Sequence, residues 1–233
     1  FLIANDFGED AIAHLKKSFE LKQPLAPEVH DKVLSLFKRY LLVGGMPDAV
    51  NEYLNSHNIV KVREVQEAIR ELYGVDASRY EEDAAKKLYI RRIYDMIPSQ
   101  MENKKKRIVA KDILDRKGDR FSNYMEEFEY LINSGITIVS HAISNPKYPL
   151  AESQQKNLLK LYMNDVGMLT SQLYHYNIQP ILNDIASINL GSVYESAVAQ
   201  ELKAHYEKLF YYDNKQKGEV GFLVDDSGTM SVL

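Results

Sequence analysis

The sequence contains no cysteine among its 233 residues, which excludes disulfides and thiolate metal ligands. It has no apolar run approaching the roughly 20 residues that a membrane-spanning helix needs. Its net charge is −4, so no overall positive field attracts nucleic acid or an anionic membrane. These absences lead us to expect a cytoplasmic protein without a membrane partner.

Several catalytic signatures are also absent. No G-x-x-x-x-G-K-[ST] segment that would cradle phosphates occurs anywhere, and no G-x-S-x-G nucleophile elbow occurs either. The six histidines never pair at i and i+4, which argues against a zinc site. They are His14, His30, His57, His141, His175 and His205.

The two ends of the sequence suggest a piece of a longer protein. It begins at Phe1 without a methionine or a signal-like segment. Near the other end, residues 217–224 alternate as a strand does, residues 225–228 are typical of a turn, and residues 229–233 begin a second strand. We therefore expect a fragment.

Helical periodicity dominates the first hundred residues. "VGGMPDAV" interrupts one helix, since Gly44 and Gly45 break it and Pro47 suits the first turn of the next. A further helix is predicted from Ile59, ending at Gly74, and another runs up to Pro98, which should end it. An apolar stripe at helical spacing marks the helix before the interruption: Val33, Leu36, Phe37, Tyr40 and Leu41.

From residue 104 the pattern becomes helix, helix and two strands. The second helix, within residues 121–135, is followed by "ITIVSHAI" and "LLKLYMND", which have the composition of strands. This order is typical of a winged helix, which most often reads DNA with its second helix. Three carboxylates expected on the exposed face of that helix would oppose phosphate binding: Glu126, Glu127 and Glu129.

The segment 101–120 is the only locally basic block, with eight Lys or Arg residues against four Asp or Glu residues. Such a cluster is usually a solvated face, but it is also the best candidate for weak phosphate contacts. The candidates for nucleic-acid contact are Lys104, Lys105, Lys106, Arg107 and Lys111.

After Asp165 the pattern predicts helices over 166–174 and 192–206, then strands over 209–212 and 219–224. A helix leading into antiparallel strands is a different unit from a winged helix. The whole sequence therefore predicts an α+β fold that is mostly helical.

Seven phrases together resemble one family, the prokaryotic AAA+ ATPases whose C-terminal half is a domain of unknown function. They follow the family's order and cover nearly the whole chain. They are "FLIAND", "YLLVGGMPDAV", "IRELYGVDASRY", "IPSQMENKKK", "KLYMNDVGML", "GSVYESAVAQEL" and "YYDNKQKGEVGFLV".

The resemblance implies a helical ATPase lid and connector over 1–98, a winged helix over 99–165 and a truncated PD-(D/E)xK nuclease-like domain over 166–233. The P-loop core of that family lies before the position of Phe1 and would be the first partner of this chain. ATP and Mg²⁺ would be cofactors of that parent protein and not of the fragment. A protein or weakly bound nucleic acid remains open as a further partner.

The resemblance also assigns site residues. Gly45, Met46 and Pro47 match the lid turn that packs on bound nucleotide, and a plain helix connection is the alternative. Glu195 matches the helix glutamate that holds Mg²⁺ in PD-(D/E)xK nucleases. The strand aspartate of those enzymes is replaced by Gly221, and the E-x-K strand would lie beyond Leu233, so Glu195 would be a vestigial or incomplete metal ligand.

We therefore predict a fragment without catalytic activity, from a parent that couples ATP hydrolysis to a nucleic-acid or protein partner. Whether the parent is an enzyme other than an ATPase stays open. The two alternatives are a DNA-binding winged-helix regulator and a Mg²⁺-dependent nuclease in the complete protein.

Overall fold

The structure is a computed structural model of the chain. It describes residues 1–2, 5, 7–80, 83–103, 106–108, 111–114, 120–175, 177–183, 190–226 and 228–232. The chain forms two compact units, each built from two segments. Unit 1 comprises residues 1–69 and 165–190, and unit 2 comprises residues 70–164 and 191–233.

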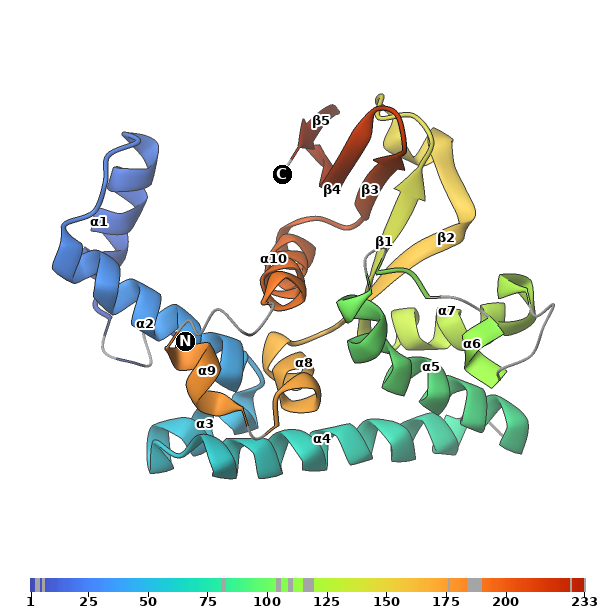
Figure 1. Cartoon of the computed structure of the whole chain (residues 1–233), viewed down its shortest axis with the longest axis horizontal. Coiled ribbons are helices and arrows are strands. Elements are labelled where there is room, and N and C mark those ends of the chain that lie inside the picture. Colours follow the sequence, from blue (N-terminus) through green and yellow to red (C-terminus); the bar gives the residue numbers. More distant parts are fainter. Residues whose placement is uncertain are drawn as a thin grey trace. The chain divides into compact units, whose positions relative to one another are not determined.

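Unit 1 is helical. Its described elements are α1 (Glu9–Glu20), α2 (Pro27–Val43), α3 (Pro47–Ser56), the first half of α4 (Ile59–Tyr80), α8 (Val166–Leu173) and α9 (Ile178–Leu182). Helix α2 packs on both α8 and α9, although more than a hundred residues separate them (Figure 1). A buried cluster of Val43, Ala49, Tyr53 and Val62 joins α2, α3 and α4.

Unit 2 contains helices and one mixed sheet. Its helices are the second half of α4, α5 (Ala84–Glu102), α6 (Lys111–Leu114), the 3₁₀ helix Phe121–Tyr124, α7 (Met125–Asn133), the 3₁₀ helix Leu150–Ser153 and α10 (Gly191–His205). Its described strands are β1 (Thr137–Ile143), β2 (Gln154–Met163), β3 (Leu209–Asn214), β4 (Gly218–Asp226) and β5 (Thr229–Val232).

The strand order is β2-β1-β3-β4-β5, with β1 parallel to β3 and every other pair antiparallel (Figure 1). Side chains alternate across the sheet, so each face carries a distinct set of residues. One face holds an apolar cluster made by Ile143, Leu150, Phe210, Tyr212 and Leu223. Helix α10 contacts β1, β2 and β3.

The α+β class predicted from the sequence is confirmed. The two strands assigned to a separate wing, β1 and β2, share a sheet with the strands assigned to the nuclease-like end. The parallel pairing of Ser140 with Leu209 joins them. Such a long-range pairing leaves no local signal in the sequence.

Two predicted helix ends are wrong. Helix α4 continues through Gly74 to Tyr80, since a glycine within a helix costs only about 1 kcal/mol. Pro98 lies inside α5 and is buried together with Ile97 and Met101. The burial of this apolar face offsets the hydrogen bond that the proline cannot donate.

Helix α7 exposes two of the three carboxylates expected on its surface, Glu126 and Glu129. Glu127 was expected on the exposed surface, but its side chain is buried. Glu127 lies three residues after Tyr124 and four before Leu131, which are both buried, so it borders the apolar face of the helix. Glu126 stays exposed and pairs with Lys86.

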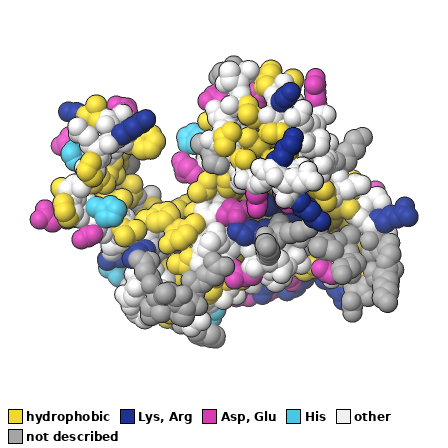
Figure 2. All heavy atoms as spheres, turned by 45° about the horizontal axis from the view of Figure 1, so that its top comes forward, with side chains coloured by type: hydrophobic (Ala, Val, Ile, Leu, Met, Phe, Trp, Pro, Cys, Tyr) yellow, Lys and Arg dark blue, Asp and Glu magenta, His cyan; other side chains and the backbone are white. Residues whose placement is uncertain are grey.

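Unit 1 carries apolar side chains on its surface (Figure 2). Helix α1 buries none of its residues, and Phe19 at its end is 86% exposed. Leu21, Leu34 and Phe37 are also exposed. Across the described part of the chain, no helix is both long enough and apolar enough to cross a membrane.

Candidate functional site

The turn between α2 and α3 is the first candidate site. Helix α2 ends where Gly44 adopts φ +76° and donates its N–H to the carbonyl of Tyr40 at 2.7 Å. Pro47 begins α3, as the sequence predicted for a proline at a first helical turn. Gly45 and Pro47 are exposed, and Met46 is half-buried.

Asp165 fixes this turn from within unit 1. Its carboxylate accepts the N–H of Gly45 at 2.6 Å and that of Met168 at 3.1 Å, so it also caps the N-terminus of α8. A Cβ at Gly44 would lie 2.0 Å from its Oδ1. The space that a side chain at Gly44 would need is therefore occupied by Asp165.

A buried guanidinium also connects α2, α4 and α8. Arg63 on α4 is 2% exposed, and one of its terminal nitrogens donates to four acceptors on α2, α4 and α8. These acceptors are the carbonyls of Leu42 and Gly167, the amide oxygen of Gln66 and the hydroxyl of Thr170. Burial lowers the pKa of Arg63 to about 10, which leaves the guanidinium charged at neutral pH.

Gln66 completes the arrangement. Its amide nitrogen donates to the carbonyls of Leu42 and Val43 at 3.0 Å each, satisfying two C-terminal carbonyls of α2. A Cβ at Gly167 would lie 2.6 Å from that nitrogen and from the carbonyl of Val43. Unit 1 therefore holds the turn at a defined position through buried polar contacts on both of its chain segments.

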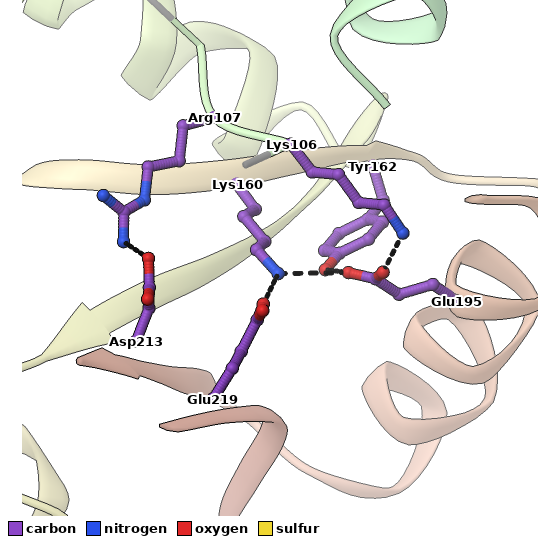
Figure 3. Close-up of polar contacts among 7 residues, drawn as sticks. All are labelled: Lys106, Arg107, Lys160, Tyr162, Glu195, Asp213 and Glu219. Atoms are coloured by element: carbon purple, nitrogen blue, oxygen red, sulfur yellow. Dashed lines mark hydrogen bonds and ion pairs between the residues drawn. The ribbon is translucent and has the colours of Figure 1, made fainter. Parts of the chain in front are cut away.

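The second candidate site lies in unit 2 around Glu195 (Figure 3). The Oε1 of Glu195 accepts the hydroxyl of Tyr162 at 2.7 Å and the ammonium of Lys160 at 3.2 Å. Its Oε2 accepts the ammonium of Lys106. Lys160 also reaches Glu219 at 3.4 Å. The helix carboxylate is therefore surrounded by cations.

A neighbouring ion pair extends this cluster. Arg107 donates to the Oδ2 of Asp213 at 2.8 Å, and its guanidinium lies 5.3 Å from the ring centre of Tyr211. The ammonium of Lys160 lies 4.8 Å from the same ring centre, so two cations contact one aromatic ring. The contacts among these side chains pair three cations with three carboxylates.

The cluster changes the protonation of two of its members. Burial would raise the pKa of Glu195, but the charge of Lys160 and the hydrogen bonds from Lys106 and Tyr162 lower it below its ordinary value. Burial, reinforced by the charge of Glu195, raises the pKa of Tyr162 well above its ordinary value. Glu195 is therefore ionised at neutral pH and Tyr162 remains a hydrogen-bond donor.

Glu195 was predicted to be an incomplete metal ligand. Mg²⁺ needs several oxygen ligands converging on one point, whereas the nearest charged groups to this carboxylate are ammonium groups. Among the described residues, no group of three His, Cys, Asp or Glu side chains has the arrangement of a metal site. A side chain at Gly221 would meet open space, since no heavy atom lies within 4 Å of its Cβ position.

The predicted nucleic-acid contacts are only partly described. Lys104 and Lys105 lie outside the described residues, and the side chain of Lys111 does as well. Lys106 and Arg107 are described, and both of their charged groups pair with carboxylates of unit 2.

Several residues of these two sites were not singled out from the sequence, among them Arg63, Lys160, Tyr162 and Asp165. An aspartate directly before an apolar helix is a common N-cap signal, so Asp165 could have been found. A lysine within the apolar run "NLLKLYM" was also a signal, because a charge within a buried strand usually has a partner. The sequence contains no comparable signal for Arg63.

Comparison with known proteins places the chain in one family. The family model described as Domain of unknown function (DUF8612) matches residues 34–177, which is more than half of the sequence, so the chain belongs to this family. The match includes both the turn at Gly45 and its partner Asp165. No curated protein and no solved structure matches the chain.

Proposed function

We propose that this chain is the non-catalytic C-terminal part of an AAA+ ATP-binding protein. In the parent it would couple ATP hydrolysis to a nucleic-acid or protein partner. The observation that carries this proposal is the turn 44–47, which Asp165 holds in place while Gly45 and Pro47 remain exposed. A rigid and exposed turn of this kind suits contact with a ligand bound on another domain.

The hydrogen bonds limit how the turn can meet a nucleotide. Because the N–H of Gly45 is donated to Asp165, it is not available to a phosphate or a base. Contact would instead use the exposed Cα of Gly45, which carries no side chain, and the exposed ring of Pro47. The nucleotide and its Mg²⁺ would be held by the P-loop core of the parent, which supplies the phosphoryl chemistry.

The surface of unit 1 supports the same proposal. Phe19, Leu21 and Phe37 are exposed on or beside α1 and α2, and exposed apolar patches commonly mark interaction sites. We assign this surface to contact with the P-loop core. Within unit 2, we further propose that α7 with the hairpin β1–β2 corresponds to a winged helix and that α10 with β3–β5 corresponds to a nuclease-like end.

The experiment compares this chain with a longer protein that carries the proposed P-loop core on its N-terminal side. ATP binding and hydrolysis are measured for both preparations under the same conditions. The longer protein should bind and hydrolyse ATP, and this chain alone should do neither. Failure of a folded longer protein to bind ATP would refute the proposal.

A Mg²⁺-dependent nuclease in the complete protein is the second candidate. It is favoured by the order of α10, which carries Glu195, followed by the antiparallel strands β3, β4 and β5. The ammonium groups of Lys106 and Lys160 oppose metal binding at Glu195. We expect no cleavage of DNA by this chain with Mg²⁺ or Mn²⁺, and cleavage that Glu195→Ala abolishes would establish the nuclease instead.

A further inference from the structure

Two successive residues, Lys106 and Arg107, tie one short segment to two different elements of unit 2 (Figure 3). The ammonium of Lys106 binds Glu195 on α10. The guanidinium of Arg107 binds Asp213 on β3. The segment therefore connects a helix and a strand that the chain itself links only through residues 206–208.

The backbone of this segment adopts an uncommon conformation. Lys106 has φ +49°, in the left-handed region that non-glycine residues seldom occupy. Such a conformation costs energy and persists only where other contacts stabilise it. The ion pair of the same residue with Glu195 can do so, and the N–H of Lys106 also donates to the carbonyl of Asn103 at 3.1 Å.

Both pairs are partly shielded from water. The side chains of Lys106 and Glu195 are 20% and 18% exposed, and those of Arg107 and Asp213 are 18% and 31% exposed. Salt screens such pairs less than fully exposed ones, so they hold more strongly than ordinary surface bridges.

The contacts can nevertheless be broken without dismantling the cluster. If Lys106 leaves, Glu195 still accepts Tyr162 and Lys160 on its other oxygen. If Arg107 leaves, Asp213 is exposed enough for water to replace the guanidinium. Neither carboxylate is then left buried without a partner. A buried charge that loses its partner is what makes breaking an ion pair costly.

We propose that Lys106 and Arg107 form a latch in unit 2, closed by Glu195 and Asp213, that opens as a local unit. In the closed state both cations are neutralised within the chain. In the open state they become available to a partner that carries phosphate or carboxylate groups. Any such partner must compete with Glu195 and Asp213, so the closed latch lowers the apparent affinity for an anion.

The test is covalent labelling of lysine amines, read residue by residue by mass spectrometry. The unmodified chain is compared with Glu195→Gln and with Asp213→Asn, below the melting temperature of each. Glu201→Gln is the matched control, because Glu201 lies on the same helix but is exposed and pairs only with His205 among the residues described. The second ion pair, between Arg107 and Asp213, is monitored by labelling Arg107 with a dicarbonyl reagent.

Two lysines serve as internal references. Lys217 is exposed and gives the rate for a free amine, whereas the side chain of Lys160 is 3% exposed and reports opening of the whole unit. We expect Lys106 to be labelled slowly in the unmodified chain. Glu195→Gln should raise that rate about 5- to 10-fold, which corresponds to losing one partly buried ion pair. Asp213→Asn should raise the labelling of Arg107 by a similar factor.

Three results would overturn the latch. Labelling of Lys106 as fast as that of Lys217 in the unmodified chain would show that the latch is not closed. Labelling rates in Glu195→Gln and Asp213→Asn equal to those in Glu201→Gln would show that the two carboxylates do not hold it. A gain in reactivity of Lys160 in parallel with Lys106 in Asp213→Asn would indicate unfolding of unit 2 instead of local opening.

Discussion

The carboxylate of Asp165 accepts the backbone N–H of Gly45 at 2.6 Å, although 120 residues separate the two. The same carboxylate caps α8 through Met168. One side chain therefore joins the turn after α2 to the helix that packs on α2. The contact with Asp165 requires a glycine at position 44, whereas Gly45 contributes only its N–H.

Gly44→Ala should strongly destabilise unit 1. The new methyl group would sit in a backbone of φ +76° and would lie 2.0 Å from an oxygen of Asp165. We expect a loss of about 2–4 kcal/mol in the free energy of unfolding, measured with urea. Gly8→Ala is the control, since no heavy atom lies within 4 Å of its Cβ position, and it should change stability by less than about 0.5 kcal/mol. Equal effects of the two substitutions would show that Asp165 does not exclude a side chain at position 44.

Arg63→Ala should be among the most damaging changes in unit 1. It would leave a cavity and remove the donor for acceptors on α2, α4 and α8. We expect a cost of about 3–5 kcal/mol in thermal or urea unfolding. Arg39→Ala, at an exposed position on α2, should cost less than about 0.5 kcal/mol. A small effect at Arg63 would mean that its hydrogen bonds contribute little net stability.

Acid should weaken unit 2 through Glu195. Because its pKa is lowered in the folded state, the unfolded chain takes up a proton at a higher pH than the folded chain does. The contribution of Glu195 to the free energy of unfolding is therefore complete above the ordinary carboxyl pKa. It is lost as the pH falls through the lowered pKa of the folded chain. Urea unfolding between about pH 6 and pH 3 should show a shallower loss of stability in Glu195→Gln than in Glu201→Gln. Identical slopes would show that the cations around Glu195 do not stabilise its charge.

Local patterns predicted the elements well and their long-range contacts poorly. The strand of "ITIVSHAI", the helix after Asp165 and the start of α3 at Pro47 follow from side-chain periodicity and proline chemistry. The end of α5 did not, because burial of the residues around Pro98 is a tertiary effect that outweighs a local preference.

In the candidate sites, too, local patterns were informative and long-range contacts were not predicted. Glu195 and Gly45 could be singled out from short motifs, but their partners could not. Lys106 comes from 89 residues before Glu195, and only the folded chain brings their charges together. The mixed sheet likewise depends on β1 pairing with β3, which no local pattern encodes.

DNA affinity should rise when the carboxylates that pair with Lys106 and Arg107 are neutralised. Any binding should be weak, independent of sequence and lost as salt rises, because phosphate contacts alone would support it. The double substitution Glu195→Gln with Asp213→Asn should strengthen the binding of a short duplex, since it releases Lys106 and Arg107. Fluorescence anisotropy at several salt concentrations measures this, with Glu201→Gln as the control. Tight and sequence-selective binding at physiological salt would support the DNA-binding alternative instead.

The central claim is that the turn 44–47 contacts nucleotide in a longer ATP-binding protein, and ATP affinity in that protein tests it most directly. Gly45→Val places a branched side chain on the exposed turn. It should weaken ATP binding by about 1–3 kcal/mol, or roughly 5- to 150-fold, by steric exclusion. Gly8→Val, also in unit 1, should leave the affinity unchanged, and thermal melting of each variant shows whether the fold is intact. Unchanged ATP affinity in a folded Gly45→Val protein would contradict the account and leave the turn as a helix connection fixed by Asp165.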